Sequence, residues 1–259
     1  MASVRVAGMV LESDGEGAPV VMLHGLGGTS NTFQPLLSWL AGFRIVRPDL
    51  PGSGRSPPPP QPITLGLLLE ALDSALSHVG VGRAHLVGHS FGAFIAQHFA
   101  ALHPQQVASL VLFGPVVAPP DSMRERLRQR AAVARHEGMG AVAGQSVPSA
   151  LAGATVSDNL LAVAFVRESH MGQNPEGFAQ SCEALAQAEK ADHRRIECPA
   201  LIVTGDEDAI APPSVARGLA DKIRGAKTVI LHRCGHWTPI EKVKECGTLL
   251  SDFLRGIPI

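Results

Sequence analysis

The feature that most constrains this chain is an apolar run, residues 84–87, that leads into Gly88-His89-Ser90-Phe91-Gly92 and then into residues with helical spacing. A strand that turns into a helix within one residue strains the backbone at the turn, and only small residues fit two positions to either side. Gly88 and Gly92 meet this requirement, so Ser90 is predicted at the apex of a nucleophile elbow, with its hydroxyl clear of the sheet. The alternative is a glycine-bounded turn whose serine only caps the helix.

The composition excludes several classes of protein. With 259 residues, 45% of them hydrophobic, the chain can bury a substantial core. Its net charge of -1 offers no basic surface for nucleic acid or for an anionic membrane. The first residues do not resemble a leader segment, and no apolar run reaches the length of a membrane span. We therefore expect a cytoplasmic protein without nucleic-acid or membrane partners.

Cysteine and tyrosine usage narrows the chemistry. Cys182, Cys198, Cys234 and Cys246 form no CxxC pair and have no histidine-rich spacing, so neither a metal site nor a disulfide framework is predicted. The chain has no tyrosine, which removes the phenol group as an acid, a base or an oxyanion donor.

Strand and helix patterns alternate over the first 115 residues. A first strand is expected from Ser3 to Leu11, followed by a hairpin turn at 14–17. Further apolar runs that predict strands lie at 19–24, 43–49, 84–89 and 107–113. Residues with helical spacing separate them near 33–40, at 63–79 and after Ser90. This alternation predicts an α/β fold, with a mostly parallel sheet and helices on both of its faces.

The segment 116–196 breaks the alternation. It contains helical stretches at 123–137, 160–169 and 175–191 and no convincing strand. Because such a segment is too long for a simple connection, we interpret it as a helical lid inserted after the sixth strand. Strand patterns resume at 200–204 and 227–232. The expected organisation is a core of residues 1–115 and 197–259 with a lid at 116–196.

Polar residues directly follow several predicted strands. Carboxyl ends of neighbouring parallel strands converge on one crevice, so Ser90 and His236 are expected to meet there. Ser90 is the candidate nucleophile, because a hydroxyl attacks well only when an adjacent base takes its proton. His236 is the candidate base, since imidazole titrates near neutral pH. Asp206 and Asp208 both follow the strand at 200–204, and either carboxylate is a candidate to orient the histidine.

With this order of serine, acid and histidine, the chain resembles α/β-hydrolase fold enzymes over essentially its whole length. The resemblance rests on HGLGG at 24–28, DLPGSGRS at 49–56, GHSFG at 88–92, GDED at 205–208 with Pro212, and Gly235-His236. It implies that Asp208 is the catalytic acid, three residues after a glycine. It also implies that the backbone N–H groups of Leu26 and Phe91 form the oxyanion hole.

Other residues near the predicted site have structural or substrate-binding interpretations. His24 and His89 are expected to hydrogen-bond to structure, and Asp49 is expected to hold the loop that follows it. The arginines of the helix at 123–137 are expected on solvated faces, with at most one reaching a substrate carboxylate. Candidates for pocket walls, each with core packing as the alternative, are Phe33, Met123, Phe165, Met171 and Trp237. Among these, Trp237 is favoured for the pocket because it adjoins His236.

The segment 174–185 resembles a lid helix of 3-oxoadipate enol-lactonases and related esterases. It departs from them at Phe178, where a tyrosine is common, and the elbow departs at Ala93, where a second glycine is usual. The resemblance implies cleavage of a small carboxylic ester or a lactone through an acyl-enzyme, without a metal or an organic cofactor. The alternatives are carbon–carbon bond hydrolysis, a cofactor-free perhydrolase, and a ligand-binding homologue with slow turnover. A homodimer is left open.

Overall fold

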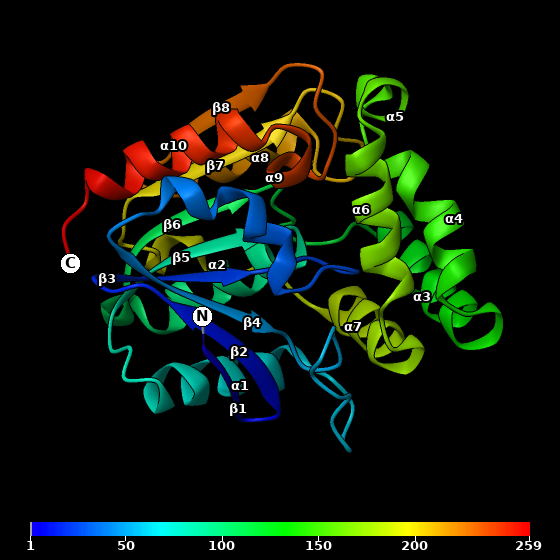
Figure 1. Cartoon of the computed structure of the whole chain (residues 1–259), viewed down its shortest axis with the longest axis horizontal. Helices are drawn as coiled ribbons and strands as arrows, with labels where there is room; N and C mark the ends of the chain where they lie inside the picture. The colour runs from blue at the N-terminus through cyan, green and yellow to red at the C-terminus, as the bar shows by residue number, and fades with distance from the viewer. Residues whose placement is uncertain (1) are drawn as a thin grey trace.

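The computed structural model describes residues 2–259, so Met1 of the expected core lies outside the described residues. An eight-stranded sheet forms the centre (Figure 1). Its strands are β1 (Ala2–Val6), β2 (Met9–Asp14), β3 (Ala18–Leu23), β4 (Phe43–Asp49), β5 (Ala84–His89), β6 (Val107–Phe113), β7 (Ala200–Gly205) and β8 (Lys227–Leu231). The order is β1-β2-β4-β3-β5-β6-β7-β8. Because β2 is antiparallel to both β1 and β4 and the other pairs are parallel, the predicted mostly parallel sheet is confirmed.

The N-terminal hairpin differs from the prediction. The expected single strand at 3–11 is two strands, β1 and β2, that turn at Ala7 and Gly8, where φ is 49° and 76°. The alternating residue pattern continues across this tight turn and hides it. The predicted hairpin turn at 14–17 instead carries the chain from β2 past the start of β4 to β3. A Cβ atom on Gly17 would collide there with the carbonyl oxygen of Gly42, which explains the glycine.

Helices cover both faces of the sheet. One face carries α1 (Leu65–His78), α2 (Phe91–Leu102) and α8 (Pro213–Ala220). The other carries the 3-10 helix η1 (Ser30–Trp39) and α10 (Val243–Arg255). The short elements are η2 (Pro104–Gln106), η3 (His193–Arg195) and α9 (Thr238–Glu241). Pro35 lies inside η1, and because proline lacks a backbone N–H it disfavours a regular α-helix there.

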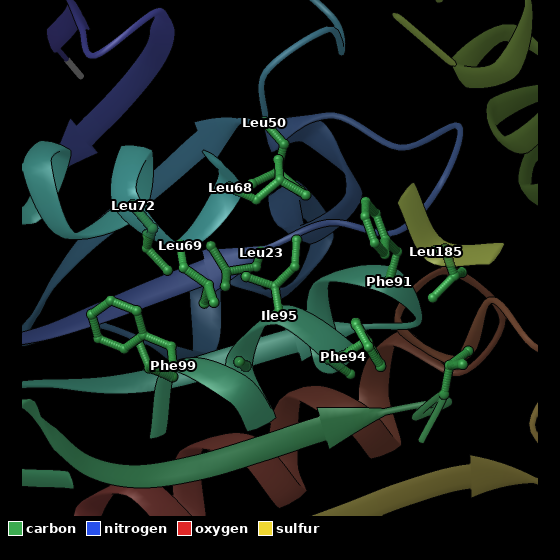
Figure 2. Close-up of a cluster of buried hydrophobic side chains, with 14 of the residues drawn as sticks. Leu23, Leu50, Leu68, Leu69, Leu72, Phe91, Phe94, Ile95, Phe99 and Leu185 are labelled. Carbon is green, nitrogen blue, oxygen red and sulfur yellow. The ribbon is translucent and has the colours of Figure 1, made fainter. Parts of the chain in front are cut away.

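Apolar packing fixes the helix that follows the elbow. Figure 2 shows Leu68 of α1 and Leu23 of β3 close to Ile95 of α2. All three side chains are at most 1% exposed. Burial of one such side chain stabilises a fold by roughly 1.5–3 kcal/mol. At the other end of the cluster, Phe91 and Phe94 extend toward Leu185, so α2 contacts both the sheet and the helices beyond it.

Between β6 and β7 lies a helical insert, as predicted. It comprises α3 (Asp121–Glu137), α4 (Met139–Ala150), α5 (Gly153–Asp158), α6 (Leu160–Met171) and α7 (Pro175–Gln187). The stretches predicted as helical correspond to α3, α6 and α7. The pattern of α4 was not recognised as helical because it contains two glycines and Pro148. Figure 1 shows the insert, in green, beside the ends of the β5 and β6 arrows. No helix in residues 2–259 has both the length and the apolar character needed to cross a membrane.

Burial lowers the pKa of several histidines, which predicts that the fold is less stable in acid. Burial, together with the charge of Arg83, lowers the pKa of His85 to about 4. Burial is also the largest cause that lowers the pKa of His193, and of His170 in the insert, to about 4. A histidine with a folded-state pKa below its unfolded value of about 6.5 binds a proton more weakly in the folded protein. The contribution of these histidines to the free energy of unfolding is therefore fully present above about pH 6.5 and is lost as the pH falls toward 4.

We expect the free energy of unfolding, measured by urea denaturation, to be lower at pH 5.0 than at pH 7.5. A pKa shift from about 6.5 to about 4 costs at most roughly 2 kcal/mol per histidine at pH 5. The His85→Gln variant should lose less stability between the two pH values than the wild type does. The matched control is His136→Gln, on the exposed side of α3. Equal losses in the wild type and in His85→Gln would contradict the assignment to His85.

Candidate active site

Ser90 is held in a strained turn between β5 and α2. Its backbone has φ 53° and ψ -112°, and φ is positive at few non-glycine residues. A Cβ atom on Gly88 would collide with the backbone of Ala93, and one on Gly92 with the carbonyl oxygen of Leu23. The Ser90 side chain makes no capping hydrogen bond to α2, so the capping interpretation does not hold. Its hydroxyl is free to face another partner.

That partner is His236, in a buried chain of two hydrogen bonds. The Nε2 atom of His236 lies 2.8 Å from Oγ of Ser90, and its Nδ1 atom lies 2.8 Å from Oδ2 of Asp208. All three residues are at most 7% exposed. The three side chains come from the turn after β5, the loop after β7 and the loop after β8. The strand ends thus bring together residues that are far apart in the sequence.

Asp208 is equipped to remain ionised. Burial alone would raise the pKa of its carboxyl group, but His236 and the N–H groups of Ala211 and Ile210 outweigh burial and lower it to about 2. These N–H groups donate at 2.7 and 2.8 Å. Asp206 has different partners, since its carboxylate contacts the exposed His232 at 2.7 Å. Of these two carboxylates, that of Asp208 is therefore the one that contacts His236.

A carboxylate that sequence reasoning missed, Glu241, organises the loop around His236. It accepts hydrogen bonds from the N–H groups on either side of this histidine, those of Gly235 at 3.1 Å and Trp237 at 3.0 Å. It also accepts from Ala152 N–H and Thr155 Oγ1 in the insert, at 2.8 and 2.7 Å. A lone glutamate in a C-terminal helix gives no sequence signal for such a role.

The loop 24–28 lies directly against the elbow. A Cβ atom on Gly25 would be 2.9 Å from Cβ of Ser90. No described residue accepts a hydrogen bond from the backbone N–H of Leu26 or of Phe91, the two groups predicted for an oxyanion hole. His24 supports this loop, because its Nδ1 donates to Gly25 O at 2.9 Å and its Nε2 accepts from Leu50 N at 3.0 Å.

His89 and Asp49 have the structural roles that were predicted for them. His89 donates from Nε2 to the carbonyl oxygen of His236 at 2.9 Å, and burial is the largest cause that lowers its pKa to about 3. Asp49 accepts from Ser30 N at 2.7 Å and from Nε of Arg55 at 2.7 Å. His89 thus supports the histidine loop, and Asp49 holds the loop at 49–56.

A cavity of about 80 Å³ adjoins Ser90 and His236. Its apolar wall includes Val116, Met123, Leu127, Leu185, Ile210 and Trp237. Met123 and Trp237 were predicted there, but Phe165 and Met171 are not among its lining residues. Phe165 packs with the apolar cluster of α4 and α6 instead, and Met171 is 39% exposed. Phe33 is fully buried in the core under η1 and α10.

Arg126 and Arg130 also line the cavity. Neither forms an ion pair with a carboxylate of residues 2–259. Arg135 of the same helix is different, since it pairs with Glu176 and Glu183. We predicted that at most one arginine of this helix reaches a substrate carboxylate, and this stays a prediction. Two arginines contribute to the cavity wall. The sequence contains a signal for both arginines. Arg130 shares one helical face with Met123 and Leu127, and Arg126 adjoins this face.

The chain is similar to known proteins over most of its length. Residues 18–243 match the alpha/beta hydrolase fold family. The chain is 31% identical to the dihydrolipoyllysine-residue acetyltransferase component of the acetoin cleaving system of Pseudomonas putida, over 94% of this chain and 65% of that protein. It is 28% identical to a 2-hydroxy-6-oxononadienedioate/2-hydroxy-6-oxononatrienedioate hydrolase of Burkholderia vietnamiensis, over 91% of this chain and 86% of that one.

Two solved structures are similar over nearly their full lengths. An esterase from Thermogutta terrifontis, with malate bound, has a TM-score of 0.93 and 25% identity, with 99% of each chain covered. The enol-lactonase from Burkholderia xenovorans has a TM-score of 0.92 and 28% identity, with 98% of this chain and 100% of that one covered. The likeness extends through the helical insert as well as the sheet.

Proposed function

The chain belongs to the alpha/beta hydrolase fold family, and within this family we propose that it is a serine hydrolase of small carboxylic esters or lactones that carry a second, ionised carboxyl group. The observation that carries the proposal is the buried hydrogen-bonded chain from Ser90 through His236 to Asp208, at the wall of a small cavity. The segment 116–196 acts as the lid of this cavity.

In the first half of the reaction, Oγ of Ser90 attacks the substrate carbonyl carbon while Nε2 of His236 takes the hydroxyl proton. The carbonyl oxygen becomes an oxyanion and is stabilised by the N–H groups of Leu26 and Phe91. The ionised Asp208 stabilises the imidazolium. His236 then gives the proton to the leaving alkoxide, and the acyl-enzyme forms. For a lactone, the leaving hydroxyl stays attached to the acyl group.

In the second half, water replaces the alcohol. His236 takes a proton from the water, the hydroxide attacks the acyl carbon, and a second tetrahedral intermediate forms in the same oxyanion site. Its collapse breaks the bond to Oγ, and His236 returns the proton to Ser90. The carboxylic acid product leaves, and the enzyme is restored.

The positive charge in the cavity wall supports an anionic substrate. Arg126 and Arg130 bring two positive charges to a cavity whose remaining wall is largely apolar, and no described carboxylate neutralises them. A guanidinium binds a carboxylate through paired charge-assisted hydrogen bonds. The similar esterase from Thermogutta terrifontis has malate, a dicarboxylate, in its structure. A small cavity with arginines in its wall matches a short acyl group that ends in a carboxylate.

The test compares two p-nitrophenyl esters, the neutral butyrate and the anionic hemiglutarate. For Arg126→Gln/Arg130→Gln, we expect kcat/KM for the hemiglutarate to fall about 10- to 100-fold, since a hydrogen bond to a charged group contributes about 1.5–3 kcal/mol. The value for the butyrate should change less than about threefold. Arg128→Gln is the matched control, because Arg128 lies on the same helix and pairs with Glu125. Equal losses for both esters would refute carboxylate recognition.

Carbon–carbon bond hydrolysis is the second candidate, favoured by the similarity to the hydrolase of Burkholderia vietnamiensis. Incubation with 2-hydroxy-6-oxononadienedioate and chromatography of the products distinguishes the two. Cleavage of this compound with no turnover of esters or lactones would replace the ester assignment.

A further inference from the structure

One side chain at the end of α6 and another two residues beyond it hold carbonyl groups of the loop 24–28, here named the oxyanion loop. Ser169 donates from Oγ to Gly27 O at 2.7 Å. Gln173 directs its Nε2 at Ser169 O, 2.7 Å away, and also at Gly28 O and Gly27 O, at 3.2 and 3.3 Å. Its side chain is buried, with the residue 5% exposed, so water competes little for these contacts.

These contacts are connected, through the backbone of the oxyanion loop, to the N–H group of Leu26. The peptide group held at Gly27 O carries the N–H of Gly28, which donates to Gly25 O at 3.0 Å. That carbonyl belongs to the peptide group whose N–H is the Leu26 donor. Two side chains of the insert are therefore connected to a proposed oxyanion donor through one intervening backbone hydrogen bond. In such a chain each hydrogen bond polarises and orients the next one.

Gln173 also joins the oxyanion loop to a third segment. Its Oε1 accepts from Gly54 N–H at 3.1 Å. Gly54 belongs to the loop 49–56, and Asp49 of that loop accepts from Ser30 N–H at 2.7 Å. One buried amide thus contacts the insert, the oxyanion loop and the loop after β4.

Gly27 allows the insert to approach this closely. Its φ is +73°, and a Cβ atom there would lie 2.5 Å from Nε2 of His170. The His170 ring is fixed from the other side, since Nδ1 donates to Val166 O at 2.9 Å. Backbone of the oxyanion loop and the ring of an insert histidine are therefore in direct contact.

We propose that Gln173 is a positioning residue that fixes the oxyanion loop relative to Ser90 and makes hydrolysis depend on the docked helical insert. The inference rests on the proposed function, which assigns the oxyanion to Leu26 N–H. If this N–H group is displaced, it stabilises the tetrahedral intermediate less, because the negative charge develops there. Substrate binding is affected less. Loss of the Gln173 contacts therefore lowers kcat and leaves KM nearly unchanged.

The test uses Gln173→Glu, which keeps the shape of the side chain and replaces the donor by a carboxylate facing carbonyl oxygens. We expect kcat for p-nitrophenyl butyrate to fall about 10- to 100-fold and KM to change less than about threefold. The affinity for butylboronic acid, which forms a tetrahedral adduct with a serine, should fall in parallel with kcat. Ser169→Ala, a milder change, should lower kcat several-fold with the same KM.

Gln180→Glu is the matched control. Gln180 also lies in the insert and accepts a backbone N–H of the core, that of Ile63 at 3.0 Å, without touching the oxyanion loop. Its kcat should match the wild type. If Gln173→Glu and Ser169→Ala kept the wild-type kcat, or if Gln180→Glu lost as much activity as Gln173→Glu, the inference would be overturned.

Amide hydrogen exchange separates this inference from the proposed function. Exchange at residues 25–28 should be faster in Gln173→Glu than in the wild type and in Gln180→Glu, and this measurement needs no substrate. Unchanged exchange overturns the role of Gln173. A wild type that cleaves no ester or lactone overturns the proposed function, while faster exchange in Gln173→Glu would still support the contact between the insert and the loop.

Discussion

The Ser90→Ala variant is expected to hydrolyse p-nitrophenyl butyrate at least about 10⁴-fold more slowly than the wild type, measured as kcat. The hydroxyl is the only group on this side chain that forms a bond to the acyl group, and His236 cannot substitute for it. Alanine keeps the Cβ atom and removes only Oγ, so the strained elbow and its surrounding glycines are left in place. Thermal unfolding should therefore show a folded protein of nearly unchanged stability.

Ser181→Ala serves as the control for Ser90→Ala. Ser181 is also buried, and its Oγ donates to Gly177 O within α7, away from the catalytic chain. We expect its kcat to stay within about twofold of the wild type. A fluorophosphonate should label the wild type and Ser181→Ala at one serine and leave Ser90→Ala unlabelled. Equal hydrolysis by the wild type and Ser90→Ala would refute the nucleophile assignment, and no hydrolysis by the wild type would favour a ligand-binding role.

Local rules explain which parts of the site were predictable. The elbow at Ser90 requires glycines at positions 88 and 92 for steric reasons, and this requirement is visible in the sequence. His236 follows a strand, and the geometry of a parallel sheet brings such positions together. The apolar runs of β5, β6 and β7 are distinct because both faces of these strands are buried. In each case the signal lies within a short segment of the sequence.

Contacts between distant segments were not predictable. Phe165 is an apolar aromatic residue of the kind that lines pockets. Because α6 packs on α4, its side chain lies against the apolar cluster of these two helices instead of the cavity. Glu241 binds Ala152 and Thr155 of the insert, and Gln173 binds the loop 24–28. These partners lie far away in the sequence, and no pattern in the chain indicates them. The hairpin at Ala7 and Gly8 was missed for a different reason, since the alternating pattern does not change across a two-residue turn.

The second large effect is expected for Asp208→Asn, which should lower kcat about 10⁴-fold. The catalytic form of His236 needs a proton on Nδ1, donated to Oδ2 of Asp208, and a free Nε2 facing Ser90. An asparagine amide can direct its own N–H at Nδ1, which favours the opposite tautomer and places the proton on Nε2. The variant also loses the negative charge that stabilises the imidazolium, so the nucleophile is no longer activated.

Asp206→Asn gives the decisive comparison, because Asp206 lies two residues earlier on the same loop and was the rival acid in the sequence. Its carboxylate contacts His232, which is exposed, and Cys234 N–H at 3.3 Å. We expect this variant to keep kcat within about threefold of the wild type for p-nitrophenyl butyrate. If Asp206→Asn instead lost the larger share of activity, the acid would have to be reassigned. The two substitutions remove the same charge from one loop, and only that of Asp208 contacts the histidine bonded to Ser90.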